Sequence, residues 1–573
     1  MRKVLFSFFS IFLGFNSIFA GWTAPNYIVA SQNADNPEYV LPAIAFNQSG
    51  YTVTAWTYID TSFLPSRANI QASISTDFGK SWPTPISYID QANYQSQLAN
   101  MFVRLAVNDN NDALMVWHRY DPTLIPAGYD VRVCSLTNTP IGPTAQNLTV
   151  LDANAGAQGG GLAPRPKIVM VDNTAIVAWD HESGGSHDIY YAITPDSGAT
   201  WPITGSIPMG ALAPNVDPVF PELYFDSTGL AIVIFQYTSD GSNYYVCQST
   251  STDSGNTWSN ASIISSSTPD WVMPALDGDN NGNAVAIWQF ETGPWPAPFD
   301  IQSSAYVSGS GWQPVQTIDT AIYDWNTPRV TMNNNSEVIA TYQMVDPTQT
   351  NYWVKTAFSS NGGQTWDIPV FVDPLNPDTN WNTHSEVAMD DYGVVLCVWN
   401  SHLGGNNWTI KGAVSNDFGS TWSTTVLSPL ATNKTAYCPR VKVGVLDTGN
   451  HHAVNGFAIW AHIDSITPYS VIEANHFQAI TLKATGEHHE IKDYLQEALQ
   501  NVITAEAIGQ NGTFRLYKDA ALTQLIGTVT HSHRVAKFIE NNVSKGETFT
   551  YYVTWTDEFN KGVVGPIAVR FED

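Results

Sequence analysis

The chain consists largely of short runs in which apolar and polar residues alternate, separated by turns rich in Gly, Asn, Asp and Pro. Runs such as NIQASI at 69–74 and DIYYAI at 188–193 are typical. Because successive side chains of a strand point to opposite faces, this alternation predicts β-strands with one buried face. Several runs lead into an octapeptide that another short apolar run follows, so we predict that the octapeptide is a hairpin turn.

The octapeptide occurs as STDFGKSW (75–82), TPDSGATW (194–201), STDSGNTW (251–258), SSNGGQTW (359–366) and SNDFGSTW (415–422). Its constant positions are Asp77, Gly79, Trp82, Asp196, Gly198, Trp201, Asp253, Gly255, Trp258, Asn361, Gly363, Trp366, Asp417, Gly419 and Trp422. Asp or Asn accepts hydrogen bonds from turn N–H groups, Gly permits positive φ, and Trp buries a large surface. Asn361 cannot act as a general base, so we interpret the octapeptide as structural rather than reactive.

A second constant element is a strand that begins near Pro, a polar turn, and a strand that ends in an aromatic residue, as in PRPKIVMVDNTAIVAWDH at 164–181. Together the two elements make a four-stranded unit that begins near residues 42, 102, 165, 219, 273, 327, 384 and 439. Such a period is typical of propeller blades. We therefore predict an all-β fold, a β-propeller of about eight four-stranded blades, with six or seven blades as alternatives.

The two ends of the predicted propeller suggest how it closes. The last unit stops after its third strand, near 469–477, and GWTAPNYIV at 21–29 is similar to the segment that follows an octapeptide Trp elsewhere. We therefore expect the mature N-terminal strand to complete the last blade. The predicted domains are a signal peptide at 1–20, which has the charged, apolar and small-residue order of a secretory signal, and a propeller at 21–480.

The repeat stops near residue 481, and residues 481–573 are predicted to form a small β-sandwich. IKDYLQEALQ at 491–500 is predicted to be a short helix or a linker, and the segments after it read as strands and turns. A Tyr-rich strand followed by Gly-Pro before the last strand resembles a fibronectin-type-III or immunoglobulin-like sandwich.

Composition narrows the class of protein. Trp 20, Tyr 25 and Phe 25 against Lys plus Arg 24 favour an all-β extracellular protein, and a formal charge of −27 disfavours nucleic acid and anionic lipid as partners. Four cysteines are too few for a disulfide scaffold in a chain of this length. We expect Cys134 and Cys247 to be free core thiols, and Cys397 with Cys438 is the one pair that we consider for a disulfide.

The octapeptide resembles the Asp-box, or BNR repeat, of the sialidase superfamily. The resemblance implies that these turns lie between third and fourth strands, away from the ligand-binding face. It also implies what a sialidase would need: three arginines for the substrate carboxylate, a Tyr nucleophile activated by Glu, and an Asp acid–base. The sequence departs from the family at Tyr39-Val40-Leu41-Pro42, where Val40 replaces the first Arg, and in its unit count, since sialidases have six blades.

Residues at the entries to first strands are the candidates for ligand binding. Four arginines could form a charged ring suited to an anionic ligand: Arg104, Arg165, Arg329 and Arg440. Alternatively, each arginine pairs with a nearby carboxylate and only fixes the strand entry.

Aromatic residues beside acids or amides are a second candidate group. Trp271, Trp325 and Trp381 precede first strands, and His181 and Glu182 follow a second strand. Tryptophan rings stack on sugar C–H faces and polar tips bind hydroxyls, although the same rings could instead seal neighbouring blades.

We expect neither a metal nor a cofactor. No metal-ligand spacing links the histidines, and DGDNNG at 277–282 has Trp288 where a calcium loop requires Glu. The hypothesis is a secreted propeller that binds a glycan or an extracellular protein without a complete catalytic set; the alternative is an exo-α-sialidase-like glycoside hydrolase. We expect a monomer without a membrane span after signal cleavage, located outside the cell, on its surface or in the periplasm.

Overall fold

The computed structural model describes residues 17–22, 26–33, 42–60, 67–79, 81–82, 87–89, 102–121, 128–139, 142–157, 164–183, 186–212, 218–293, 297–323, 327–378, 384–402, 408–428, 434–447, 452–464, 469–493, 496–507, 512–519, 523–531, 535–541, 548–556 and 561–570. The chain forms two compact units, a larger one of Ala24–Gly444 with Gly456–His476, and a smaller one of Met1–Thr23, Val445–Asn455 and Phe477–Asp573. The described residues form strands and turns but no helix, which confirms the all-β prediction.

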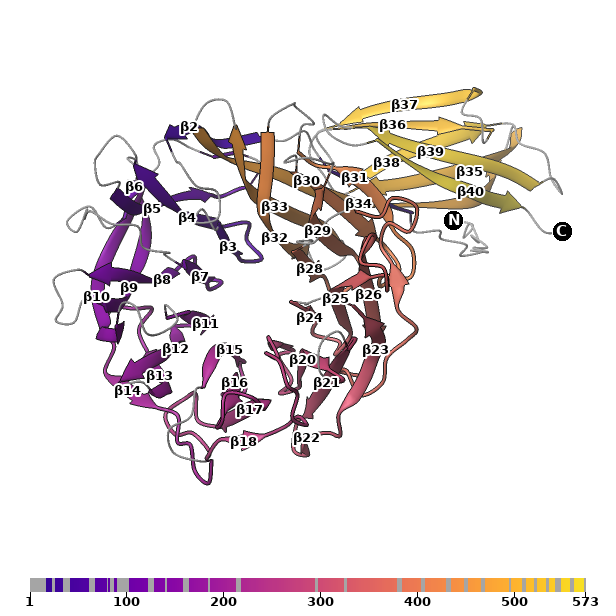
Figure 1. The fold of residues 1–573 in the computed structure, drawn as a ribbon. Coiled ribbons are helices and arrows are strands. Elements are labelled where there is room, and N and C mark those ends of the chain that lie inside the picture. Colours follow the sequence, from indigo (N-terminus) through magenta and orange to yellow (C-terminus); the bar gives the residue numbers. More distant parts are fainter. Residues whose placement is uncertain are drawn as a thin grey trace. The chain divides into compact units, whose positions relative to one another are not determined.

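The larger unit contains seven antiparallel sheets, each made of strands that follow one another in the chain (Figure 1). The first strands are β3 (Ala43–Phe46), β7 (Arg104–Val107), β11 (Lys167–Val171), β15 (Val219–Phe225), β19 (Ala275–Gly278), β24 (Arg329–Met332) and β28 (Ser385–Met389). The second strands are β4 (Thr52–Asp60), β8 (Ala113–Asp121), β12 (Thr174–Ser183), β16 (Ala231–Thr238), β20 (Ala284–Glu291), β25 (Val338–Val345) and β29 (Val395–His402).

The third and fourth strands complete these sheets. The third strands are β5 (Arg67–Ser75), β9 (Gly128–Thr139), β13 (Ser186–Thr194), β17 (Tyr244–Ser251), β21 (Phe299–Val307), β26 (Tyr352–Ser359) and β30 (Trp408–Ser415). The fourth are β6 (Ser87–Tyr88), β10 (Gly142–Ala157), β14 (Ile203–Ser206), β18 (Ser262–Ile263), β22 (Gly311–Trp312), β27 (Val370–Phe371) and β31 (Ser423–Val426), and β23 (Gln316–Ile322) also pairs with β21.

A further sheet contains β32 (Lys434–Asp447), β33 (His452–Asp464) and β34 (Tyr469–Asp493). Its outer position is taken by β2 (Asn26–Asn33), which pairs with β34 from Asn26–Ala474 to Asn33–Tyr469. An N-terminal strand therefore does pair with the third strand of the last unit. The number of blades and the closure of the ring remain predictions.

Each second strand carries one large aromatic side chain at the same position, and none of them is more than 2% exposed. These are Trp56, Trp117, Trp179, Phe235, Trp288, Tyr342, Trp399 and Trp460. The first strands of successive sheets lie side by side from β3 through β28. Burial of the repeated aromatic residue between sheets thus sets the packing.

The octapeptide lies between the third and fourth strands in all five copies and shares two backbone hydrogen bonds in each. In the first copy, Ser81 N–H donates to Asp77 Oδ1 (3.0 Å) and Gly79 N–H donates to Ser75 Oγ (3.0 Å). Asn361 takes the place of Asp and accepts from Thr365 N–H at 3.0 Å. These carboxylates are therefore occupied in holding turns.

The octapeptide glycines lie where a side chain would collide with a neighbouring sheet. Gly198 has φ +84°, and a Cβ there would lie 2.5 Å from Leu114 of β8. Gly79 lies in the same way against Phe457 of β33, and Trp82 packs on that ring at a centroid distance of 5.2 Å. The sheet of β33 therefore packs against the sheet of β3 to β6.

The smaller unit also consists of strands. β1 (Ser17–Trp22) and β35 (Gln496–Ala507) pair with β34, and β38 (Val535–Asn541) pairs with β35. A separate four-stranded sheet has the order β37 (Leu525–His531), β36 (Gly512–Tyr517), β39 (Thr548–Thr556) and β40 (Lys561–Arg570). The predicted helix or linker at 491–500 is wrong, because Ile491 pairs with Ala498 and Lys492 with Glu497 in a β-ladder.

None of the four cysteines forms a disulfide, so the pair considered, Cys397 with Cys438, is not bridged. Cys397 is fully buried in β29, where burial raises the pKa of its thiol to about 12. Cys134 and Cys247 are buried free thiols, as predicted. Burial in apolar surroundings makes such thiols unreactive.

Candidate functional site

Six charged residues from six different first strands form what we call the first-strand cluster. Its members are Arg104, Lys167, Glu222, Arg329, Glu386 and Arg440. Each lies one to three positions after the start of its repeated unit, at or near the beginning of the first strand. The repeated unit therefore presents all six groups in the same way.

Ion pairs link neighbouring members of the cluster. Lys167 Nζ lies 2.5 Å from Glu222 Oε1, and Glu386 Oε1 accepts from both Arg329 Nε (3.2 Å) and Arg440 Nη1 (2.5 Å). The side chains of these five residues are 19–34% exposed, so solvent reaches them. The two guanidinium groups lower the pKa of Glu386 to about 2 against the opposing effect of burial, and the carboxylate stays ionised.

Arg104 is the exception in this cluster. Its Nη1 donates to the backbone carbonyl of Val103 at 2.8 Å, and among the described residues no carboxylate lies within ion-pair distance of it. Burial, together with the charges of Arg440 and Arg329, lowers the pKa of Arg104 to about 10, although Glu222 and Glu386 oppose the shift. Four cations and two carboxylates leave the cluster with a net charge of +2.

This geometry suits an anion. Burial, and secondly Arg104 and Arg329, lower the pKa of Lys167 to about 8, although Glu222 opposes the shift. Cations that depress one another's pKa in this way are stabilised by an anionic partner. A guanidinium without a carboxylate can bind a carboxylate or sulfate group through two parallel hydrogen bonds.

Arg165 lies beside the cluster in a stack of rings. Its Cζ is 4.1 Å from the centroid of Phe220 and 5.4 Å from that of Phe102. Phe220 in turn lies 5.3 Å from Trp271. We call Phe102, Arg165, Phe220 and Trp271 the ring arc, because they lie at the entries to the first strands of four successive sheets, Phe220 as the second residue of β15 and the other three just before β7, β11 and β19.

His118 contacts the ring arc from the second sheet. It is fully buried in β8 with its ring 5.4 Å from Phe102. Burial, with the charges of Arg165 and Arg104, lowers the pKa of His118 to about 3. A histidine that stays neutral at ordinary pH cannot serve there as a general acid.

The remaining predicted site residues lie elsewhere or outside the described residues. His181 Nδ1 contacts Asp152 Oδ2 of β10 at 2.6 Å, and its ring stacks on Tyr190 at 4.2 Å, so it ties two sheets together. Glu182 is half-buried in β12. Trp325 and Trp381 fall outside the described residues. The structure thus brings Arg104, Arg329 and Arg440 together and places Arg165 in the adjoining ring arc.

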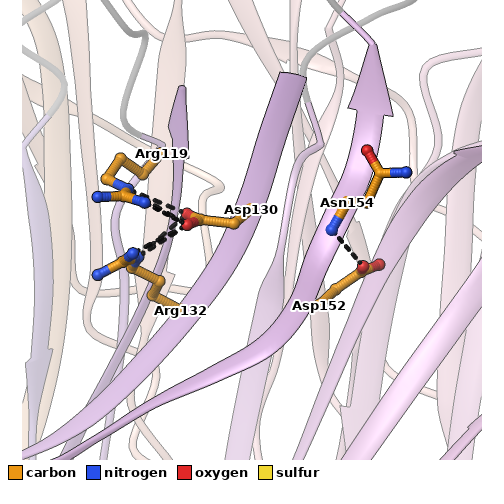
Figure 2. Close-up of polar contacts among 5 residues, drawn as sticks. All are labelled: Arg119, Asp130, Arg132, Asp152 and Asn154. Carbon is orange, nitrogen blue, oxygen red and sulfur yellow. Dashed lines mark hydrogen bonds and ion pairs between the residues drawn. The ribbon is translucent and has the colours of Figure 1, made fainter. Parts of the chain in front are cut away.

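Sequence reasoning missed a buried ion cluster in the second sheet. Arg119 Nη2 and Arg132 Nη2 lie 2.7 Å and 2.9 Å from Asp130 Oδ2, with all three side chains 5–8% exposed (Figure 2). Arg119 is directly opposite Asp130 in the β8–β9 ladder, and Arg132 follows Asp130 by two residues. Three charges inside otherwise apolar strands were the signal that could have revealed it.

Figure 2 also shows Asp152 of β10 as a point of attachment. Its Oδ1 accepts from the Asn154 backbone N–H at 3.0 Å. Its Oδ2 accepts from Trp179 Nε1 at 2.9 Å. Since Trp179 is the buried aromatic residue of β12, this carboxylate holds the second sheet to the third.

Neither a metal site nor a membrane-spanning helix is found among the described residues. Among the residues that the structure describes, no group of three or more His, Cys, Asp or Glu side chains could hold a metal ion. The described part of the chain also has no helix that is long and apolar enough to cross a membrane.

No protein-family model matches the sequence. No curated protein matches it either. Among solved structures, it is similar to an ulvan lyase described as a polysaccharide lyase of a new family (10% identity, TM-score 0.43, covering 79% of this chain and 94% of that one). A Fusarium graminearum α-L-arabinofuranosidase (13%, 0.36, 66% and 92%) and a Hadza microbial sialidase (14%, 0.33, 61% and 73%) are also similar. At these identities and TM-scores, the likeness assigns neither a ligand nor an activity to this chain.

Proposed function

We propose that this chain is an exported, eight-bladed Asp-box propeller that binds an anionic saccharide through the first-strand cluster. The observation that carries the proposal is Arg104, a guanidinium with lowered pKa that faces Arg329 and Arg440 without a carboxylate of its own among the described residues. A carboxylate or sulfate would supply the missing charge. The aromatic rings beside the cluster suit a saccharide better than an inorganic ion.

Closure of the ring is part of this proposal. Contacts of Gly79 and Trp82 with Phe457, and the pairing of β2 with β34, support it. In a closed propeller the first strands surround a central channel, so the cluster would line the site where such folds bind ligands.

A glycan array incubated with the intact protein tests the proposal. We expect binding to uronate- or sulfate-bearing glycans and none to their neutral counterparts, with signals that fall as salt is raised because exposed charges are screened. Binding confined to neutral glycans, or to no glycan, would overturn the proposal.

The second candidate is an exo-α-sialidase-like hydrolase, which the electrostatic coupling of Arg104, Arg329 and Arg440 favours. Among the described residues, the environment of a tyrosine with a carboxylate partner disfavours the hydrolase. Tyr342 donates to Asp319 at 3.0 Å, and burial followed by that carboxylate raises the pKa of Tyr342 well above its usual value, which weakens it as a nucleophile. Release of the fluorophore from a fluorogenic sialoside would establish the hydrolase, and no release above background would exclude it for that substrate.

A further inference from the structure

The ring arc lies next to the first-strand cluster without being part of it. Phe102, Arg165 and Phe220 each precede a cluster member, namely Arg104, Lys167 and Glu222, by two residues. The arc and the cluster therefore adjoin at the entries to three successive first strands.

The arc is partly accessible and presents flat faces. Phe102, Arg165 and Trp271 are half-buried, while Phe220 is 7% exposed and contacts both Arg165 and Trp271. Ring faces and a guanidinium plane carry no hydrogen-bond preference of their own, and they suit the C–H faces of an uncharged sugar.

A polar pair accompanies these faces. Asp180 is 2% exposed, and its Oδ1 accepts from the Arg165 backbone N–H at 2.9 Å. Asp180 Oδ2 and Arg165 Nε are buried, and neither has a hydrogen-bond partner among the described residues. Leaving such buried groups without a partner is unfavourable, so a polar ligand group that reached either of them would be stabilised.

We infer that the ring arc is a second saccharide subsite, which binds an uncharged sugar unit next to the acidic unit held by the first-strand cluster. The ligand is then an oligosaccharide of at least two units rather than a single acidic sugar. This inference rests on the proposed function for the identity of the acidic unit.

Titration calorimetry with a small panel of saccharides tests the subsite. The probes are glucuronate, a hyaluronan tetrasaccharide in which glucuronate alternates with uncharged N-acetylglucosamine, and neutral xylotetraose. We expect the acidic oligosaccharide to bind about tenfold more tightly than the acidic monosaccharide, which corresponds to roughly one good contact. Trp271→Ala and Phe102→Ala should lower the oligosaccharide affinity about three- to tenfold and leave the monosaccharide affinity unchanged.

Trp353→Ala is the matched control, because Trp353 packs on Phe371 in the sixth sheet, away from the arc. Equal affinity for the monosaccharide and the oligosaccharide would overturn the subsite, and so would an equal loss of both affinities in Trp271→Ala. Binding of xylotetraose alone with sensitivity to Trp271→Ala would support the subsite and overturn the acidic unit. If none of the saccharides binds, both the subsite and the proposed function are wrong.

Discussion

At the scale of single residues, Arg104 combines an unfavourable environment with an accessible position. The positive charges of Arg440 and Arg329 oppose it, and its one protein partner described is the carbonyl of Val103. Residues that reduce stability in this way are typical of binding sites, where a ligand compensates for the strain.

Replacing this charge with an apolar side chain of similar length should therefore stabilise the fold. For Arg104→Met we expect the free energy of unfolding to rise by about 0.5–2 kcal/mol, since repulsion within the cluster is relieved. Urea denaturation measures it, with Arg515→Met in the smaller unit as the control. A loss of more than about 1 kcal/mol would show that Arg104 is structural.

The partners of individual charges could not be predicted from the sequence. The alternative that the arginines only pair with carboxylates describes Arg329 and Arg440, which share Glu386, but not Arg104. The difference depends on which side chains face one another across separate sheets. The cluster around Asp130 was missed for the same reason, because its pairing depends on the register of β8 and β9.

At the scale of the elements, the octapeptide glycines combine two requirements. Gly198 needs φ +84° and lies against Leu114, whereas Gly241 has φ +68° with no atom within 4 Å of the position that a Cβ would take. Gly198→Ala should cost about 2–4 kcal/mol, and Gly241→Ala about 1 kcal/mol, because only the first adds a collision to the backbone strain. Thermal unfolding of the two variants measures this difference, and equal losses would mean that contact with the next sheet contributes nothing.

The turns between first and second strands form a second repeated element. Asn47, Asn108 and Asn333 each donate from Nδ2 to a backbone carbonyl of the next sheet, at 2.8, 2.7 and 3.1 Å. In the equivalent turn between β28 and β29, Asp390 Oδ1 accepts from Tyr392 N–H and Val394 N–H. Its buried Oδ2 has no hydrogen-bond partner among the described residues. Burial, assisted by Asp391, raises the pKa of Asp390 to about 6.

Stability should therefore depend on pH at this turn. Because the pKa of Asp390 is raised from 3.8 to about 6, folding takes up a proton between these two pH values. The contribution of Asp390 to the free energy of unfolding is therefore complete below pH 3.8 and is lost as the pH rises through about 6. Asp390→Asn should stabilise the protein by about 1–3 kcal/mol at pH 7.5 and have little effect at pH 4. Chemical denaturation at both pH values checks this, and an equal effect at both would contradict it.

The elements themselves were largely predictable from the sequence. Alternation and the repeated octapeptide located strands and turns because both depend on local chain geometry. The structure of segment 491–500 could not be predicted, because its apolar spacing also fits a helix. Only the pairing of β34 with β35 makes it a pair of strands.

At the scale of the whole molecule, the contact of Phe457 with Gly79 and Trp82 joins sheets at opposite ends of the larger unit's sequence. Phe457→Ala should cost about 3–5 kcal/mol, because Phe457 is 2% exposed, and should lower the melting temperature of the larger unit as one transition. Scanning calorimetry measures it. Early melting of the last sheet alone would indicate an open array of sheets instead of a closed ring.

Binding of an anionic saccharide by the first-strand cluster is tested most directly by calorimetry. The dissociation constant is measured for the acidic glycan that gives the strongest array signal, with the wild-type protein, Arg104→Met and Arg515→Met. We predict that Arg104→Met weakens binding about tenfold or more without loss of stability, since a hydrogen bond to a charged group contributes about 1.5–3 kcal/mol, and that Arg515→Met binds like the wild type. Unchanged affinity in Arg104→Met would contradict the claim.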